Sequence, residues 1–301
     1  MSARPGMLRR SVEGGCIIID GKTVIYGIIG HPVRHSFSPA MHNAALREAG
    51  LNGVYVPFEP PPELLPEALA GIRALGIAGL NVTVPYKEAV MPYLDELAGD
   101  AVLYGAVNTV VNHRGRLVGH NTDGPGFIRA LREDHRYNPA KGSALVFGAG
   151  GSARAVAVAL ARAGCPELAL VNRRVERAEA LARVIFEATG IKVRVFKWDS
   201  AGSDLADFAR RAALLVNCTP VGMAGKADAD FPLPEALPGK GQLAYDLVYN
   251  PPLTPFLNRA ARSGAEIANG IGMLLHQGAL SFEIWTGRAA PLEVMRRELY
   301  R

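Results

Sequence analysis

The chain has 301 residues, of which 49% are hydrophobic, so it can bury a sizeable core, and its length suggests about two domains. The formal net charge is +5, but the basic residues are scattered rather than gathered in blocks, which favours a solvated basic surface over nucleic-acid binding. The 33 glycines and 21 prolines follow no fixed period, which excludes collagen-like and low-complexity chains.

Residues 1–20 contain early arginines, but their longest apolar run of four residues is too short for a signal peptide. We therefore interpret them as an N-terminal extension. No stretch approaches the ~18 apolar residues of a membrane helix, so we expect a soluble, cytoplasmic protein. The three cysteines, Cys16, Cys165 and Cys218, lie far apart without metal-ligand spacing, as expected of free thiols in a reducing compartment. We expect no metal.

Apolar runs and helical patterns alternate through the first part of the chain, which is typical of βαβ units and a mainly parallel sheet. The predicted strands are 23–30, 53–59 and 77–85, and the predicted helices are 38–50, 62–76 and 86–97. A hairpin follows, with strands 105–112 and 117–122.

A second alternating series begins near Gly126 with a predicted helix over 127–135. Its predicted strands are 143–148, 167–172, 192–198, 213–218 and 242–249. The last segment, 269–287, predicts an apolar helix that returns to pack on the first lobe. The sequence therefore predicts an α/β fold of two lobes, of which the first is discontinuous.

The stretch "SALVFGAGGSARAVAVALARAG" predicts a strand, a turn containing Gly148, Gly150 and Gly151, and an alanine-rich helix. Such glycines let backbone amides approach a pyrophosphate at the helix N-terminus. The run departs from GxGxxG, since Ala153 stands in place of the last glycine, but alanine still permits close packing of helix and strand. This context predicts a dinucleotide site.

The end of the next strand indicates which dinucleotide binds. An NAD site generally has an acidic residue about 20 residues past the glycines. This chain instead has Asn172, followed by Arg173, Arg174 and Arg177, and arginine forks suit a 2′-phosphate. The sequence therefore favours NADP.

Polar residues follow several predicted strands of the first lobe. Lys87 lies just after "GLNVTVP", Asn108 lies in "GAVNT", and Asp123 stands at a predicted helix start. Ser36 and Ser38 follow the first strand. Because ligands of open α/β sheets bind beyond the carboxyl ends of strands, we expect these five side chains to share a site, although an N-cap role alone would account for Asp123.

Over nearly its whole length after residue 20, the chain resembles the shikimate dehydrogenase family. The stretches that carry the resemblance occur in family order: "HSFSP", "GLNVTVPYK", "GAVNT", "GHNTDG", "GAGGSARA", "NRR", "NCTPVGM", "DLVYNPPLTPFL" and "NGIGMLLHQGAL". Two positions depart from the family's usual residues, His31 in place of asparagine and Arg174 in place of threonine or serine, and Arg174 bears on the cofactor preference.

The resemblance implies an enzyme that reduces 3-dehydroshikimate to shikimate with NADPH. It implies a substrate-binding domain over 21–123, completed by 270–301, and a Rossmann-type NADP domain over 124–269. Lys87 and Asp123 would be the catalytic pair. The implied substrate contacts are Ser36, Ser38, Thr83, Lys87, Asn108, Asp123, Tyr249 and Gln277. The implied cofactor contacts are Gly148, Ala149, Gly150, Gly151, Ser152, Asn172, Arg173, Arg174, Arg177, Thr219, Leu247 and Gly270.

Three alternatives stay open from the sequence. The first is a quinate/shikimate dehydrogenase that uses NAD, and the second is an NADP-sensing protein without turnover. The third, nucleic-acid binding, has only the basic charge in its favour. For partners, we expect a small-molecule substrate, no nucleic acid, no membrane, and a monomer or homodimer.

Overall fold

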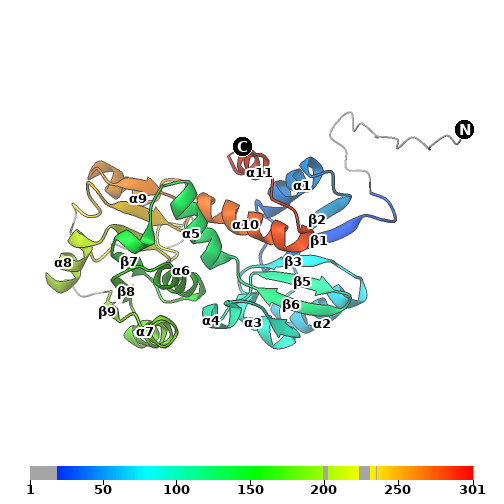
Figure 1. The fold of residues 1–301 in the computed structure, drawn as a ribbon, viewed down its shortest axis with the longest axis horizontal. Coiled ribbons are helices and arrows are strands. Elements are labelled where there is room, and N and C mark those ends of the chain that lie inside the picture. Colours follow the sequence, from blue (N-terminus) through cyan, green and yellow to red (C-terminus); the bar gives the residue numbers. More distant parts are fainter. Residues whose placement is uncertain (1–18, 199–202, 224–230, 235, 301) are drawn as a thin grey trace, which may run out of the picture.

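The computed structural model describes residues 19–198, 203–223, 231–234 and 236–300. They form two α/β lobes, each built around a six-stranded sheet, which lie side by side along the long axis of the molecule (Figure 1). The predicted α/β class is therefore confirmed. Residues 1–18 of the predicted extension, and Cys16 with them, lie outside the described residues.

The first sheet has the strand order β2-β1-β3-β5-β6-β4. Strand β1 pairs in parallel with β2 and β3, whereas β5 pairs antiparallel with both β3 and β6. The β5–β6 hairpin is the predicted one. The strands are β1 (Val24–Ile29), β2 (Gly53–Phe58), β3 (Gly79–Val82), β4 (Glu96–Leu97), β5 (Thr109–His113) and β6 (Arg116–His120).

Two helices of the first lobe, α1 (Ser38–Glu48) and α2 (Leu65–Ala74), were predicted, but the run 86–97 is not the single helix expected. It forms the one-turn helix α3 (Tyr86–Ala89), a 3-10 turn (Met91–Tyr93) and the edge strand β4. Pro92 has no N–H to continue a helix, and β4 pairs with β6. Two further short elements are the 3-10 turn Pro62–Leu64 and α4 (Ala101–Tyr104).

The period-2 alternation of "GLNVTVP" predicts that Val82 and Val84 share one buried face of a strand, but the Val84 side chain is 69% exposed. Strand β3 ends at Val82, so the alternation of its two faces does not reach residue 84. All four residues of β3 are buried, as expected of a strand covered on both faces.

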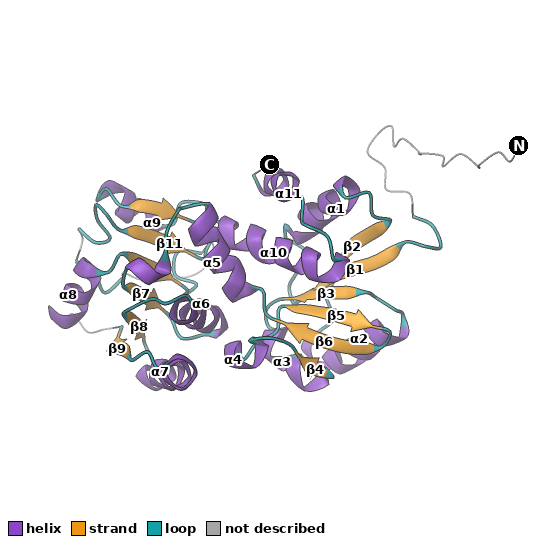
Figure 2. Ribbon diagram, in the orientation of Figure 1, coloured by secondary structure: helices purple, strands orange, loops and turns teal. Residues whose placement is uncertain are grey.

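The second sheet is parallel throughout, with the order β12-β11-β10-β7-β8-β9. Helices cover both faces of it (Figure 2), and buried apolar clusters lie on each side. Strand β12 was not predicted. The strands are β7 (Ala144–Phe147), β8 (Leu168–Asn172), β9 (Val193–Lys197), β10 (Leu214–Asn217), β11 (Leu243–Asp246) and β12 (Glu266–Ala268). The helices are the 3-10 turn Pro139–Lys141, α6 (Gly151–Arg162), α7 (Val175–Thr189), α8 (Ser203–Arg211) and α9 (Pro255–Arg262).

Helices α5 (Asp123–Glu133) and α10 (Ile271–Thr286) lie between the lobes, and α11 (Leu292–Leu299) packs against α1 and α10. Helix α10 lies across the middle of the molecule beside α5 (Figure 1). Its Leu275 and Phe282 pack with Tyr26 and Met41 in the core of the first lobe. The predicted return of the C-terminal helix to the first lobe is therefore confirmed.

Candidate active site

A cavity of about 250 Å³ lies between the lobes, at the carboxyl ends of β1 and β3. This is the edge at which open α/β sheets bind small molecules. The residues that line it include every predicted substrate contact: Ser36, Ser38, Thr83, Lys87, Asn108, Asp123, Tyr249 and Gln277. Ser152, Leu247 and Gly270, which were predicted to contact the cofactor, line it too.

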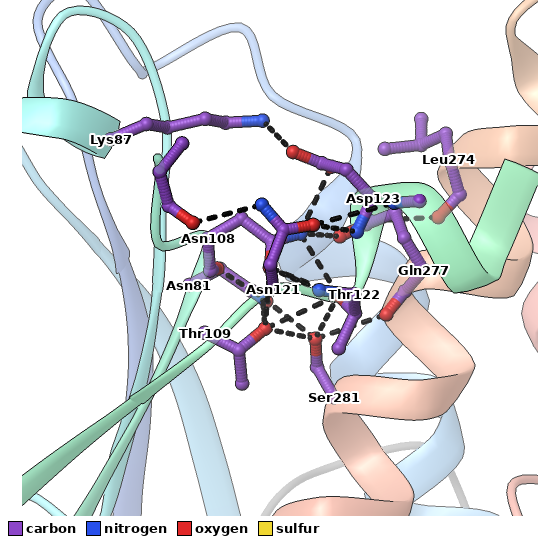
Figure 3. Close-up of polar contacts among 12 residues, drawn as sticks. Asn81, Lys87, Asn108, Thr109, Asn121, Thr122, Asp123, Leu274, Gln277 and Ser281 are labelled. Atoms are coloured by element: carbon purple, nitrogen blue, oxygen red, sulfur yellow. Dashed lines mark hydrogen bonds and ion pairs between the residues drawn. The ribbon is translucent and has the colours of Figure 1, made fainter. Parts of the chain in front are cut away.

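The ammonium of Lys87 meets the carboxylate of Asp123 in this cavity. Lys87 Nζ lies 2.6 Å from Asp123 Oδ2, although the residues are far apart in sequence (Figure 3). Lys87 belongs to α3, and Asp123 is the first residue of α5, where the helix dipole favours a negative charge. The Asp123 side chain is only 8% exposed, so water screens the pair weakly.

Asp123 is not the cap of its helix, which was the structural alternative to a functional role. The side chain of Asn121 accepts hydrogen bonds from the backbone N–H groups of Asp123 at 3.0 Å and Gly124 at 3.3 Å. The carboxylate of Asp123 is therefore free to accept from side chains. One oxygen accepts from Lys87 and the other from Asn108 Nδ2, at 2.9 Å.

Asn108 connects the pair to a buried polar layer (Figure 3). Its Nδ2 also lies 2.9 Å from Thr122 Oγ1 and 3.2 Å from Gln277 Oε1, while its Oδ1 accepts from the Thr122 N–H at 2.7 Å. Behind it, Asn81, Thr109 and Ser281 bond to one another. Because buried polar groups need partners, this layer fixes the direction of each amide in the site.

Ser36 and Ser38 lie at the start of α1. The Ser38 N–H donates to Ser36 Oγ at 3.2 Å, and Ser38 is buried as the first residue of the helix. Tyr249 also lines the cavity, and its ring lies 5.8 Å from that of Phe37, the residue between the two serines. Burial raises the pKa of Tyr249, so its hydroxyl stays a neutral donor at pH 7. Hydroxyl donors beside a helix N-terminus suit a carboxylate ligand.

Thr83 reaches the cavity because Gly30 leaves room for it. A Cβ on Gly30 would lie 2.4 Å from the Thr83 methyl carbon. The backbone N–H of Thr83 donates to Ile29 O at 2.9 Å, which continues the β1–β3 pairing by one residue.

The glycine turn joins β7 to α6 as predicted. Gly148 has φ +112°, and a Cβ on Gly150 would meet nothing within 4 Å, so open space faces the first turn of α6. A second cavity, of about 310 Å³, is lined there by Ala149, Gly150, Gly151 and Arg177 together with Glu88, Gly105 and Arg154. The space and the free amides fit a dinucleotide pyrophosphate.

The other predicted cofactor residues lie around this turn. Arg173 lies over the Trp198 ring at 5.7 Å, and Asn172 Nδ2 donates to Arg174 O at 2.8 Å. Asn172 is the last residue of β8, Arg173 and Arg174 follow it, and none of the three lines either cavity. A Cβ on Gly148 would touch the methyl carbon of Thr219 at 3.3 Å.

Several lining residues were not predicted. Met273 and Leu274 lie about one helical turn before Gln277 on α10, so the helical spacing could have found them. Asn81 stands in the same motif as Thr83 and Lys87. Glu88 and Arg154 stand beside predicted residues, but no sequence pattern marks them as facing a cavity.

The structure also bears on the expectations for the cysteines, for a metal site and for a membrane helix. Cys165 and Cys218 are free thiols, and burial raises the pKa of both. Within the described part of the chain, no group of three or more His, Cys, Asp or Glu side chains is arranged to hold a metal. The helices in that part of the chain also lack the length and apolar character needed to cross a bilayer.

Comparison with known proteins identifies the family. The model of the shikimate dehydrogenase substrate binding domain matches residues 28–110, and that of the shikimate 5′-dehydrogenase C-terminal domain matches 270–300. The shikimate dehydrogenase (NADP+) of Desulforamulus reducens is 49% identical over 287 residues, covering 94% of this chain and 97% of that relative.

Solved structures of this family have the same fold as the chain. Shikimate 5-dehydrogenase from Thermus thermophilus, in complex with NADP(H) and shikimate, has a TM-score of 0.81 and 42% identity, covering 92% of this chain and 99% of that one. Quinate dehydrogenase from Corynebacterium glutamicum, in complex with NAD, has a TM-score of 0.83 at 34% identity, covering 92% and 99%. The resemblance predicted from the nine motifs is confirmed, and the chain belongs to the family of NADP-dependent shikimate dehydrogenases.

Proposed function

We propose that the chain reduces 3-dehydroshikimate to shikimate, reversibly and with NADPH, in the cavity between the lobes. One observation carries the proposal: the ammonium of Lys87 and the carboxylate of Asp123 lie 2.6 Å apart in a cavity lined from both lobes. An NADP-sensing protein would need no such pair.

The substrate carboxylate would bind at the start of α1. Ser36 and Ser38 would donate through neutral hydroxyls, and Tyr249, whose ring lies beside Phe37, would donate as well. The ring hydroxyls would meet Thr83, Asn108 and Gln277. These contacts orient the ring, so they contribute to turnover as well as to binding.

Lys87 would supply the proton that the reduced carbonyl oxygen takes up. When bound, NADPH supplies a hydride to the substrate carbonyl carbon. Lys87 Nζ then donates a hydrogen bond or proton to the developing alkoxide, while Asp123 keeps the ammonium in place. Asn108 holds the second oxygen of Asp123, so the carboxylate cannot turn away.

The cofactor would lie along the glycine turn, between Gly148 and Ser152. Open space over Gly150 supports this placement, because a pyrophosphate needs close access to backbone amides. Arg177 lines the same cavity, and Asn172, Arg173 and Arg174 lie at the end of the next strand. Their lack of negative charge supports binding of a 2′-phosphate. Thr219, Leu247 and Gly270 would contact the nicotinamide end.

Steady-state assays with shikimate or quinate, each with NADP+ or NAD+, test this function. We expect the highest kcat/KM for shikimate with NADP+, and preferential oxidation of quinate with NAD+ would overturn it. Lys87→Ala and Asp123→Asn should each lower kcat by roughly 10²–10⁴ with NADP+ affinity nearly intact. Lys141→Ala, at an exposed lysine of the second lobe, is the control. Unchanged activity in both site variants would refute the assigned roles.

We also propose the domain limits 21–123 with 270–301, and 124–269, for the substrate and NADP domains. The glycine turn and its parallel sheet, all within 144–268, support the second domain. The free thiols of Cys165 and Cys218 support a cytoplasmic location, which cell fractionation would test. We expect a monomer or homodimer, and light scattering would measure the oligomeric state.

A further inference from the structure

Arg154 joins the two lobes through two hydrogen bonds to one backbone carbonyl. It lies in the first turn of α6, next to the glycine turn, and its side chain reaches α4 of the first lobe. Arg154 Nε and Nη2 donate to the backbone carbonyl of Leu103 at 3.0 and 2.9 Å. Helices α4 and α6 lie against each other at this place (Figure 1).

Gly105 makes room for this guanidinium. Gly105 ends α4 with φ +61°, and a Cβ on it would lie 2.6 Å from Arg154 Cζ. The end of α4 therefore fits the arginine closely, and a larger residue at position 105 would displace it.

The segment that Arg154 holds, residues 103–108, contacts both members of the catalytic pair. The Val107 N–H donates to the backbone carbonyl of Lys87 at 2.8 Å. Asn108 Nδ2 donates to Asp123 Oδ1 at 2.9 Å. These bonds connect Leu103–Asn108 to the carboxylate and the backbone that carries the ammonium.

Asn121 adds a further link. Its Nδ2 donates to Ala106 O at 2.9 Å, and its Oδ1 accepts from the Asp123 N–H (Figure 3). The N-terminus of α5 is therefore fixed to the same segment.

We propose that Arg154 is a positioning residue that sets the catalytic pair relative to the glycine turn. It connects the turn through α6 to segment 103–108, and that segment holds Lys87 and Asp123. The effect of Arg154 on turnover rests on the proposed function, because kcat is measured for that reaction. Two donors of one planar guanidinium converge on a single carbonyl oxygen, so they fix a direction as well as a distance, which a single lysine donor does not.

A direct contact of Arg154 with the cofactor is the rival reading, because Arg154 lines the cavity over Gly150 and Gly151. The two readings differ in what the residue changes. A cofactor ligand changes NADP+ affinity, whereas a positioning residue changes kcat while the pyrophosphate amides stay as they are.

The test compares wild type, Arg154→Gln and Arg154→Lys with the control Arg162→Gln. Arg162 lies on the same helix and pairs with Asp100 at 3.3 Å before α4, with both side chains partly exposed, so its loss should change kcat less than about twofold. For Arg154→Gln we expect kcat to fall roughly ten- to a hundredfold, with the Kd for NADP+ within about threefold. Arg154→Lys should recover part of the loss, and it serves if Arg154→Gln does not fold.

Amide hydrogen exchange supplies a readout that needs no turnover. Exchange at residues 103–108 should speed up in Arg154→Gln and not in Arg162→Gln. A rise in the Kd for NADP+ at constant kcat would overturn the proposal, as would unchanged kcat or unchanged exchange. Wild type that does not oxidise shikimate would refute the proposed function instead, and the exchange result would still decide whether Arg154 holds the segment.

Discussion

The buried carboxyl group of Asp246 should make the stability of the chain depend measurably on pH. It ends β11 with none of its surface exposed. Its Oδ1 accepts from Asn217 Nδ2 at 2.9 Å and from the Val248 N–H at 3.0 Å, and its Oδ2 accepts from Thr254 Oγ1 at 2.6 Å. Burial raises its pKa from 3.8 to about 6, although these three donors act in the opposite direction.

The pKa gives the sign and the size of the effect. Because the pKa is higher in the folded chain, the unfolded chain loses this proton first as pH rises. The free energy of unfolding therefore falls between the unfolded pKa, 3.8, and the folded pKa, about 6, and then stays constant. A difference of roughly two pKa units corresponds to about 3 kcal/mol in total.

Asp246→Asn removes this titration while keeping the shape of the side chain. Urea denaturation of wild type and variant, followed by circular dichroism from about pH 4.5 to 7.5, measures it. Relative to wild type, the variant should become more stable toward neutral pH by about 2 kcal/mol over this range. A stability difference that does not change with pH, or that changes in the other direction, would refute the reasoning.

Two further substitutions test how α5 packs against α10 and pairs with α11. In Gly126→Ala, the new Cβ would lie 2.6 Å from the backbone nitrogen of Gln277, so we expect the free energy of unfolding to fall by about 2 kcal/mol and the KM for shikimate to rise. In the control Gly71→Ala on α2, the new Cβ meets nothing within 4 Å and should not destabilise the fold. Equal denaturation midpoints for the two variants would contradict this. Burial opposes ionisation of Asp134, but bonds from His276 and Arg296 outweigh it and lower the pKa of Asp134. Arg296→Met should therefore cost about 2 kcal/mol at neutral pH and less as acid protonates the carboxyl, and a loss measured by denaturation that does not shrink on acidification would disprove this role.

The meeting of Lys87 and Asp123 could be anticipated because each follows a predicted strand or begins a predicted helix. Period-2 runs and glycine turns are local signals, so they located most of the strands and the start of α6. The family motifs then supplied Gln277 and Tyr249, which no local pattern would have joined to this cavity.

Features that depend on distant partners could not be anticipated in the same way. Strand β12 has three residues and exists through its pairing with β11. Asn121 accepts from the nearby N–H groups of Asp123 and Gly124, but its hydrogen bond to Ala106 O reaches back 15 residues along the chain. The reach of Arg154 to Leu103 depends on how the lobes sit together, and no spacing along the sequence encodes it.

The return of α10 and α11 to the first lobe sets an order of completion during synthesis. A ribosome releases the strands of the first sheet early, but Tyr26 and Met41 lack their covering partners until residues 271–299 emerge. The second lobe, with all its strands between residues 144 and 268, has left the ribosome by then, so its sheet can form before the first lobe is complete. A nascent chain that stops short of Gln277 therefore carries every strand of the second sheet beside a first lobe that still lacks part of its core.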